Sequence, residues 1–233
     1  MYRNKKITIY IPCRNESKNL EAIKSFIPNY VDEVIVVSNR STDDTYEKAL
    51  SLGFKAYKDD REVKGIGYGY AHMTGIANAT GDIILSIDGD AEHPLDNLSE
   101  MLDKFIDNKY DFMYCHRLPP AKDSKINIMQ KIGVYILNFT AFALYGIYLK
   151  DILSGMWFIN KDIKDSLELT EGDWNLSPQI KINAAKNKKL KFAEYSIRQN
   201  RRSKGSSKQQ YLKTGLSHLR WLVSNRFSPL KVQ

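Results

Sequence analysis

Two aspartates, Asp88 and Asp90, stand on either side of a glycine and follow directly on the apolar run IILSI. Carboxylates at this spacing can approach one Mg²⁺ or Mn²⁺ ion, because Gly89 lets the backbone bend between them, and such an ion can bridge two phosphates. Glu92 and His93 follow and could complete the ligand shell, or His93 could only brace the loop. The pattern D-x-D also occurs in solvated acidic turns, so its place after a buried strand is what favours a metal site.

Positive charge is concentrated in the second half of the chain. The formal net charge is +8, but residues 1–117 hold 15 Lys/Arg against 19 Asp/Glu, whereas residues 118–233 hold 20 against 8. An acidic half suits a cation, and a basic half suits an anionic partner such as nucleic acid, an anionic membrane or phosphate groups. Charge alone does not choose among these partners.

The composition of the 233 residues, with 42% hydrophobic and 27% charged side chains, excludes disordered and collagen-like chains. The length allows one large domain or two small ones. Cys13 and Cys115 are too few for a disulfide scaffold and lack metal-ligand spacing, which favours free thiols in a reducing compartment. The basic N-terminus is not typical of a signal peptide, which predicts a cytoplasmic protein.

Short β-branched runs alternate with helical stretches through the first half of the chain. The predicted strands cover 7–11, 33–38, 82–88 and 110–115, and the predicted helices cover 15–27, 41–53, 67–79 and 95–107. This order predicts an α/β fold with an open, mostly parallel sheet flanked by helices. Ligands of such sheets bind beyond the carboxyl ends of the strands. Polar residues gather at those ends, at 12–16, 38–41, 88–93 and 116–117.

The second half contains one long apolar segment, 132–149, whose 18 uncharged residues stand between Lys131 and Lys150. At about 1.5 Å per residue, a helix of this length falls just short of the hydrocarbon thickness of a membrane. A core helix, or an amphipathic helix in the membrane surface, is therefore favoured over a span. A span would also place the basic tail on the opposite side of the membrane from Asp88 and Asp90.

The order of these segments resembles family 2 glycosyltransferases, which use nucleotide sugars and have the GT-A fold. IPCRNESKNL (11–20) is similar to the opening I-P-x-Y-N-E-x-x-N-L of that family, and VVSNRSTDDT (36–45) resembles its V-V-D-N/D-x-S-T-D-x-T. The segment 67–94 resembles G-x-G-x-A-x-x-x-G followed by A-T-G-D-x-I-x-x-x-D-A-D-x-Q-H-P. Together these matches cover about residues 1–117.

Two segments of the second half narrow the resemblance. NFTAFALYGIYLKDILSGMWFI (138–159) looks like the N…G…D-x-x-S-G-F segment of polyprenyl-phosphate glycosyltransferases, which include dolichyl-phosphate mannose synthases. AEYSIRQNRRSKGSSK (193–208) is similar to their E-V-P-I…R-x-x-G-x-S-K. The resemblance implies one glycosyltransferase domain over 1–233, in which 1–117 binds the nucleotide sugar and 118–233 faces the acceptor and the membrane with interface helices.

The resemblance also implies which residues bind the nucleotide. The first loop of the family lies against the nucleoside, and the matching residues here are Pro12, Arg14, Asn15 and Glu16. Arg14 replaces the usual aromatic residue, and its flat guanidinium group can still stack on a base. Asn39 matches the residue that hydrogen-bonds the base edge. Its amide suits uracil without excluding guanine or cytosine, and Ser38 stands where an Asp is expected.

Asp88 and Asp90 match the pair that binds the metal and the diphosphate, and Glu92 stands where the subgroup often has a third, Gln, ligand. The implied cofactor is Mg²⁺ or Mn²⁺. Basic residues are expected around the sugar diphosphate and the acceptor phosphate. The implied catalytic residues are thus Asp90, Arg117, Arg202 and Lys208.

The implied reaction moves a sugar, with inversion, from a nucleoside diphosphate such as UDP or GDP to a polyprenyl phosphate. A lipid phosphate is ionised near neutral pH and needs no catalytic base. A hydroxyl of a polysaccharide or glycolipid would need one, and Glu171 and Asp173 are candidates for it. The basic tail and the apolar segment favour the lipid phosphate and a peripheral site at the cytoplasmic face of a membrane. A nucleic-acid-binding protein is the alternative of another class, against which the acidic first half argues.

Overall fold

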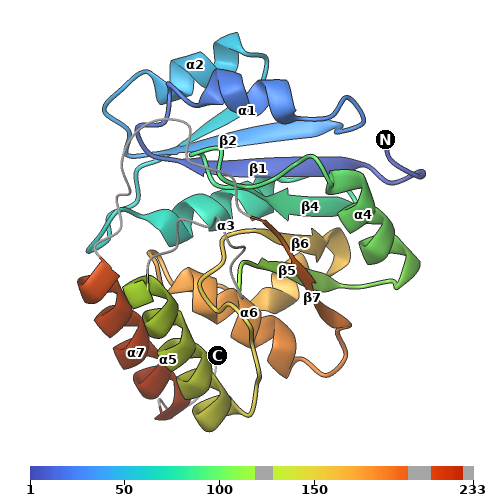
Figure 1. Cartoon of the computed structure of the whole chain (residues 1–233). Coiled ribbons are helices and arrows are strands. Elements are labelled where there is room, and N and C mark those ends of the chain that lie inside the picture. The colour runs from blue at the N-terminus through green and yellow to red at the C-terminus, as the bar shows by residue number, and fades with distance from the viewer. Residues whose placement is uncertain (119–127, 199–210, 228–233) are drawn as a thin grey trace.

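The structure is a computed structural model that describes residues 1–118, 128–198 and 211–227, without the side chain of Tyr211. Within these residues, seven strands form one sheet in the order β3-β2-β1-β4-β6-β5-β7 (Figure 1). All neighbouring strands are parallel except β6, which runs antiparallel to both β4 and β5. The strands are β1 (Ile7–Cys13), β2 (Glu33–Asn39), β3 (Lys55–Asp59), β4 (Ile83–Ser86), β5 (Phe112–His116), β6 (Trp157–Asn160) and β7 (Phe192–Ser196). The open, mostly parallel sheet expected from the sequence is confirmed.

Helices cover both faces of this sheet (Figure 1). They are α1 (Leu20–Phe26), α2 (Thr45–Ser51), α3 (Tyr68–Asn78), α4 (Leu98–Asp107), α5 (Ile128–Tyr145), α6 (Leu176–Lys186) and α7 (Tyr211–Phe227), with a 3₁₀ helix at Lys161–Leu167. Side chains of α1, α2 and α4 belong to one hydrophobic core, and side chains of α3, α5, α6 and α7 belong to the other.

Successive side chains of β1 point alternately into the two hydrophobic cores. Ile7, Ile9 and Ile11 are fully buried in the core beneath α1 and α4, whereas Tyr10 points into the opposite core. Successive side chains of a strand point to opposite faces of the sheet, so a central strand must be apolar on both. This two-sided burial makes β1 rigid, and β1 ends at the loop that begins the candidate site.

Several predicted boundaries shift in the structure. The helix expected from residue 15 begins only at Leu20, because Asn15 has φ 53° and a left-handed residue interrupts a right-handed helix. The strands β3, β6 and β7 were not predicted. β3 and β7 lie at the sheet edges with few fully buried side chains, and β6 has only four residues.

The apolar segment predicted at 132–149 forms α5 over Ile128–Tyr145 and ends in a turn at Gly146, where φ is 70°. Among the described residues, α5 is the one helix that is long and apolar enough to cross a membrane by length and composition. α7 packs beside it (Figure 1), and the hydroxyl of Tyr145 donates a hydrogen bond to the carbonyl of Leu222 at 2.7 Å. The second half therefore ends in a pair of neighbouring helices.

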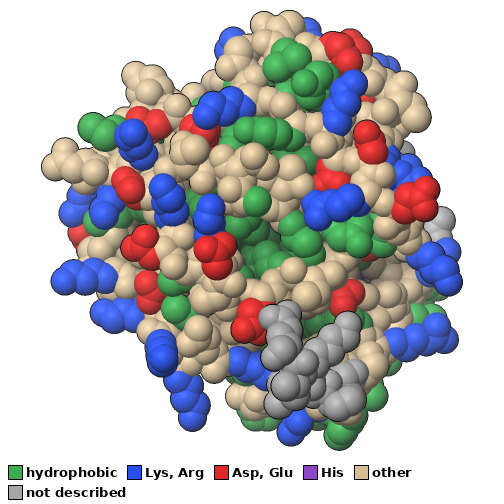
Figure 2. Space-filling model, turned by 180° about the vertical axis from the view of Figure 1, so that it is seen from behind, with side chains coloured by type: hydrophobic (Ala, Val, Ile, Leu, Met, Phe, Trp, Pro, Cys, Tyr) green, Lys and Arg blue, Asp and Glu red, His purple; other side chains and the backbone are tan. Residues whose placement is uncertain are grey.

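The face turned away in Figure 1 carries charges of both signs. Figure 2 shows acidic and basic side chains interspersed over this face, with hydrophobic side chains gathered near its centre. Near the N-terminus, Arg3 contacts Asp103 at 2.8 Å and Asp107 at 2.7 Å, and these ion pairs tie the N-terminus to α4. Exposed pairs of this kind stabilise a fold only slightly.

Candidate functional site

The loop after β1 is joined to the loop after β2 through Asn15. The backbone N–H of Asn15 donates to Ser41 Oγ at 3.1 Å, and its side-chain oxygen accepts from the N–H of Thr42 at 2.7 Å. The backbone N–H of Glu16 donates to Thr45 Oγ1 at 3.0 Å. Asn15, expected to contact the nucleotide, is thus engaged in holding two loops together at the carboxyl edge of the sheet.

Asn39 lies at the end of β2 and is buried, and the two polar atoms of its side-chain amide differ in their hydrogen bonding. Its Nδ2 donates to the carbonyl of Asp59 at 3.2 Å. Its Oδ1 is buried without a hydrogen-bond partner among the described residues. Gly67 approaches so closely that a Cβ there would lie 2.6 Å from Nδ2. A buried oxygen in this state is costly and suits a ligand that carries an N–H group.

Asp88 lies just beyond β4 in a loop that His93 braces. His93 Nδ1 accepts the backbone N–H of Asp88 at 2.8 Å, and Nε2 lies 3.7 Å from Asp88 Oδ2. Burial lowers the pKa of His93 to about 4, so the ring is neutral near pH 7. Because Nδ1 accepts, the proton is on Nε2 and faces the carboxylate. The structure thus gives His93 a bracing contact with the loop.

Close approaches at two glycines show that the Asp88 loop lies between parts of the chain that are distant in sequence. A Cβ on Gly89 would lie 2.6 Å from Cys13 Sγ and 3.3 Å from the carbonyl of Pro12, so the loop lies against the end of β1. A Cβ on Gly155 would lie 2.8 Å from both Asp88 Oδ2 and the hydroxyl of Tyr68. The structure therefore brings the first loop, the aspartate loop and the segment before β6 together.

Arg117 follows β5 and is fixed by Asp151, a fully buried carboxylate that sequence analysis gave no role. Arg117 Nε donates to Asp151 Oδ2 at 2.7 Å and Nη2 donates to Oδ1 at 3.0 Å, a bidentate pair. Burial opposes the charge of Arg117, but Asp151, together with Asp88 and Glu92, holds its pKa above the ordinary value. Arg117 is thus a fixed positive charge within electrostatic reach of two predicted metal ligands.

The residues present suit a metal ion shared with a phosphate ligand. The described residues contain no group of three or more His, Cys, Asp or Glu side chains that could hold a metal ion, so Asp88, Asp90 and Glu92 do not form a closed protein site there. The chain turns at Ala91, where φ is 62°, and Asp90 Oδ1 accepts the N–H of Glu92 at 3.1 Å. Mg²⁺ is typically bound by one or two carboxylates plus substrate phosphates. The aspartate pair fits that arrangement.

Asp173, a candidate base in the sequence analysis, is engaged at the start of α3. Its Oδ1 accepts the backbone N–H groups of Ile66, Gly67 and Tyr68 at 3.2, 3.1 and 3.3 Å. Burial raises the pKa of Asp173, although these bonds favour the ionised form. The next residue, Trp174, stacks on Tyr68 with ring centroids 4.6 Å apart. The 173–174 segment therefore supports the helix that carries Tyr68.

Two predicted site residues, Arg202 and Lys208, lie outside the described residues. The residues that the sequence analysis missed are Asp151, Gly155, Tyr68 and also Lys181, a fully buried residue of α6 whose Nζ lies 2.6 Å from the carbonyl oxygen of Ser154, next to Gly155. Asp151 and Gly155 belong to the D-x-x-S-G segment and could have been noticed there. Tyr68 and Lys181 carry no such signal, because their neighbours at the site are distant in sequence.

Two archaeal relatives are similar to this chain over most of its length. A dolichol-phosphate mannosyltransferase of Pyrococcus furiosus is 28% identical over 215 residues, which are 87% of this chain and 59% of that protein. A UDP-N-acetylglucosamine–dolichyl-phosphate N-acetylglucosaminyltransferase of Methanococcus voltae is 25% identical over 83% of this chain and 89% of that protein. The chain thus spans less than two thirds of the Pyrococcus protein.

Solved structures show the same fold at low sequence identity. Glucosyl-3-phosphoglycerate synthase from Mycobacterium tuberculosis, in complex with Mn²⁺ and UDP-glucose, superposes with a TM-score of 0.70 at 18% identity, over 96% of this chain and 79% of that chain. This likeness confirms the GT-A-type sheet with flanking helices. A family model described as Glycosyl transferase family 2 matches residues 8–167. The chain belongs to Glycosyl transferase family 2.

Proposed function

We propose that this protein transfers a sugar, with inversion, from a nucleoside-diphosphate sugar to a polyprenyl phosphate. The observation that carries the proposal is the position of Asp88, which lies against Gly155 and Tyr68 and interacts electrostatically with the fixed charge of Arg117. This arrangement suits a diphosphate. The acceptor is inferred from the two relatives, both of which are named for dolichyl-phosphate substrates.

The nucleotide binds at the carboxyl ends of β1, β2 and β4 in this proposal. Pro12, Arg14 and Glu16 shape the loop against the nucleoside, and Asn15 keeps that loop in place. Asn39 Oδ1 accepts an N–H of the base, which removes its buried unpaired state. Uracil and guanine offer a ring N–H for this contact, and UDP and GDP are the nucleotides that we propose; the amine of cytosine could also donate, so this contact alone does not select the base.

The chemistry is a displacement at the anomeric carbon in which the diphosphate leaves with increased negative charge. Asp88 and Asp90, with Glu92 beside them, would hold Mg²⁺ or Mn²⁺, and a bound ion would supply Lewis-acid stabilisation of that charge. Arg117 adds a second positive group, and its pairing with Asp151 means that it needs no reorganisation during the reaction. Arg202 and Lys208 are proposed to clamp the two phosphate groups.

A phosphate acceptor needs no general base, because it is ionised near neutral pH. The engagement of Asp173 supports this choice over a hydroxyl acceptor, since its Oδ1 receives three backbone N–H groups of α3. In the proposed division of labour, 1–117 binds the donor, and 118–233 faces the lipid acceptor. Both parts contribute strands to the one sheet, so the two substrates can meet at its carboxyl edge.

The helices α5 and α7 are proposed to lie on the cytoplasmic face of a membrane. Large apolar side chains are exposed along both helices: Ile128, Met129, Ile132, Tyr135, Ile136, Phe139 and Phe142 on α5, and Leu212, Leu216, Val223 and Phe227 on α7. The opposite side of α5 packs on the protein through Val134, Leu137 and Ala141. A helix with one side in the protein and one apolar side free suits peripheral binding at the lipid surface.

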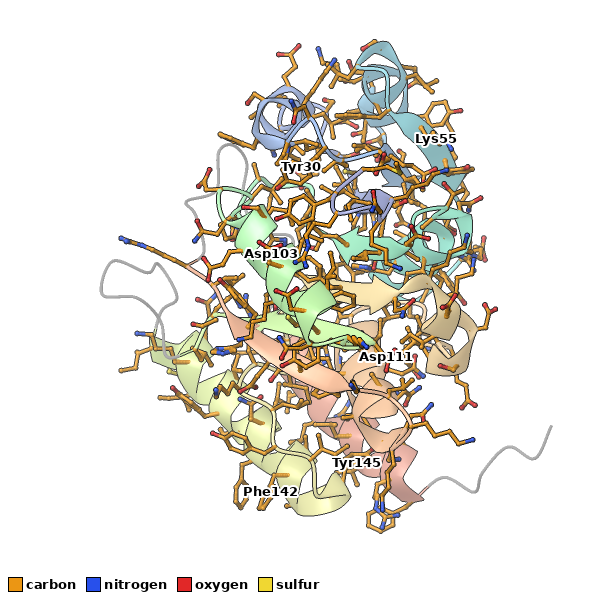
Figure 3. All side chains as sticks on the ribbon, turned by 90° about the vertical axis from the view of Figure 1, so that its right-hand side faces the viewer. Tyr30, Lys55, Asp103, Asp111, Phe142 and Tyr145 are labelled. Carbon is orange, nitrogen blue, oxygen red and sulfur yellow. The ribbon has the colours of Figure 1, made fainter. Side chains whose placement is uncertain are left out.

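The pair lies at the end of the molecule away from α1 and α2 (Figure 1), and Figure 3 shows Phe142 and Tyr145 at that end. Lys131, Lys213, Arg220 and Arg226 lie on the same two helices and suit anionic headgroups. A lipid acceptor would then reach the site from the surface on which the protein rests.

The proposed function is tested with purified protein, Mg²⁺ or Mn²⁺, labelled UDP- or GDP-sugars and a short polyprenyl phosphate. The expected product is a lipid-linked sugar phosphate that forms with one donor and requires the divalent ion. The matched control acceptor is the corresponding polyprenol, which lacks the phosphate and should remain unglycosylated. Transfer to the polyprenol, or to a glycan, with none to the lipid phosphate would contradict the proposed acceptor.

A further inference from the structure

Lys181 is fully buried on α6, at a position where the protein surrounds its ammonium group with oxygen atoms. Its Nζ lies 2.6 Å from the carbonyl oxygen of Ser154 and 3.0 Å from that of Ile152. It also lies 2.9 Å from the hydroxyl and 3.2 Å from the carbonyl of Ser177, one turn earlier on the same helix. Burial lowers the pKa of Lys181 to about 7, and the four acceptors are enough for the protons of Nζ whether the group is ionised or neutral.

The two carbonyls from outside α6 belong to one short segment, the 151–155 loop between α5 and β6. The first residue of this loop, Asp151, forms the bidentate pair with Arg117. The last, Gly155, lies against Asp88 and Tyr68. The loop therefore contacts two of the charged groups that the proposed reaction uses, Arg117 at one end and Asp88 at the other, and Lys181 contacts the loop between them.

We propose that Lys181 is a positioning residue: its Nζ donates to the carbonyls of Ile152 and Ser154 and so fixes the 151–155 loop between Arg117 and Asp88. The structural part of this proposal is independent of the reaction, and its kinetic part rests on the proposed function.

Ser177 cannot hold the loop alone. Its hydroxyl lies 3.2 Å from the carbonyl of Ile152 and 3.1 Å from that of Ser154, but it has a single proton to donate. Without Lys181, at least one of these buried carbonyls would share that proton or lose its donor. A buried carbonyl that loses its donor favours a shifted loop that can recover one from water.

Asn138 also holds the 151–155 loop, but at the beginning of the loop. Asn138 on α5 accepts the N–H of Ile152 at 3.0 Å and donates to the carbonyl of Lys150 at 2.8 Å. These bonds hold the beginning of the loop and do not involve the carbonyl of Ser154. Lys181 thus sets the part of the loop that leads into Gly155.

The test compares Lys181→Met, which keeps a long unbranched side chain and removes the donors, with Ile182→Ala on the same buried stretch of α6. Hydrogen–deuterium exchange is measured on peptides that cover the 151–155 loop, together with thermal stability, kcat and donor KM. Lys181→Met is expected to speed exchange in the loop at least about tenfold and to lower kcat/KM at least about tenfold. Ile182→Ala is expected to lower thermal stability while kcat/KM stays within about twofold.

Unchanged exchange in the loop of Lys181→Met, or an equal fall of kcat/KM in both variants at matched stability, would overturn the proposal. Ser177→Ala provides a milder variant should Lys181→Met not fold, with about threefold faster exchange expected in the same peptides and no change there counting against the proposal. Exchange needs no substrate, so faster exchange in a protein that transfers no sugar would contradict the proposed function and leave the loop contact standing.

Discussion

Gly155 leaves the space in which the carboxylate of Asp88 and the hydroxyl of Tyr68 lie. A Cβ at this position would be 2.8 Å from each oxygen, so Gly155→Ala must displace one of them. We expect nucleoside-diphosphate binding in the presence of Mn²⁺ to weaken at least about tenfold, measured by calorimetry. Gly133→Ala on α5 is the matched control, because nothing lies within 4 Å of its added Cβ. Equal affinity of Gly155→Ala and the control would show that Asp88 does not need this space.

Asp90 is the second carboxylate of the proposed metal and diphosphate site. Asp90→Ala is expected to reduce sugar transfer at least about a hundredfold, on the scale of losing a preorganised electrostatic contact. Turnover is measured at saturating donor and metal, with circular dichroism to show that the fold is retained. Asp96→Ala, an exposed aspartate six residues later, should transfer sugar at the rate of the unaltered protein. A folded Asp90→Ala variant with unchanged turnover would remove the metal-site interpretation.

The sequence was informative about the site wherever the relevant residues follow a strand. Pro12, Asn39 and Asp88 all stand at carboxyl ends that the pattern of buried strands predicts, because parallel strands end at one edge. The pairing of Arg117 with Asp151, 34 positions later, has no local pattern. It depends on how β5 and the segment before β6 meet, which is a property of the folded chain.

The start of α3 is an element whose stability depends on a distant residue. Asp173 receives three backbone N–H groups of residues 66–68 and takes the place of a local capping side chain, since the N-cap position is Gly67. Asp173→Ala should lower the free energy of unfolding by about 1 kcal/mol, the usual effect of losing a cap, measured by urea denaturation.

A second variant of Asp173 distinguishes a helix-capping role from the role of a catalytic base. Asp173→Asn keeps an oxygen acceptor and should retain most of the activity, because Asn and Asp cap helices about equally well. A base would be lost in both variants. Loss of transfer in a stable Asp173→Asn variant would therefore revive the hydroxyl-acceptor alternative.

His218 makes the packing of α7 sensitive to acid. It is buried, its Nδ1 lies 2.9 Å from Asn175 Oδ1, and burial lowers its pKa to about 4. The folded protein keeps His218 neutral, whereas the unfolded chain takes up a proton below its ordinary pKa of about 6.5. The destabilising contribution of His218 is therefore absent above pH 6.5. As the pH drops from 6.5 towards 4, this contribution lowers the free energy of unfolding by on the order of 3 kcal/mol.

Denaturation midpoints at pH 7.5 and pH 5 measure this dependence. His72 and His93 also have lowered pKa values and add to the loss in acid. His218→Gln, which keeps a donor for Asn175 but does not titrate, should reduce the difference between the two midpoints. An unchanged difference would assign the acid sensitivity to groups other than His218.

The central elements of the fold could be predicted because their burial is two-sided. β1 and β2 are almost fully buried and therefore apolar throughout, which the sequence displays directly. β3 and β7 lie at the sheet edges, where half-exposed side chains such as those of KAYKD and FAEYS are chemically ordinary. What places them is pairing with β2 and β5, and such long-range pairing leaves no periodic signal.

On the scale of the whole molecule, the distribution of charge and apolar surface supports the proposed membrane-bound acceptor. The helices α5 and α7 lie away from α1 and α2 (Figure 1). Asp88 and Arg117 follow the carboxyl ends of β4 and β5. A lipid phosphate presents a charged head and an apolar chain at once. The proposed function requires that both contact the protein together, and the second half of the chain is the part proposed to bind them.

Membrane binding through the α5–α7 pair is the prediction that tests this arrangement. Phe139 is 71% exposed and Phe142 is 51% exposed on α5. Burying one such side chain contributes about 1.5–3 kcal/mol, so the double variant Phe139→Ser/Phe142→Ser should bind anionic vesicles at least about tenfold more weakly in co-sedimentation. Phe26→Ser on α1 is the matched control, because Phe26 is 54% exposed on another part of the surface. Binding should also weaken with added salt, since the basic side chains of α7 would face the headgroups in the proposed arrangement. Equal binding by the double variant and the control would place the membrane contact elsewhere on the molecule.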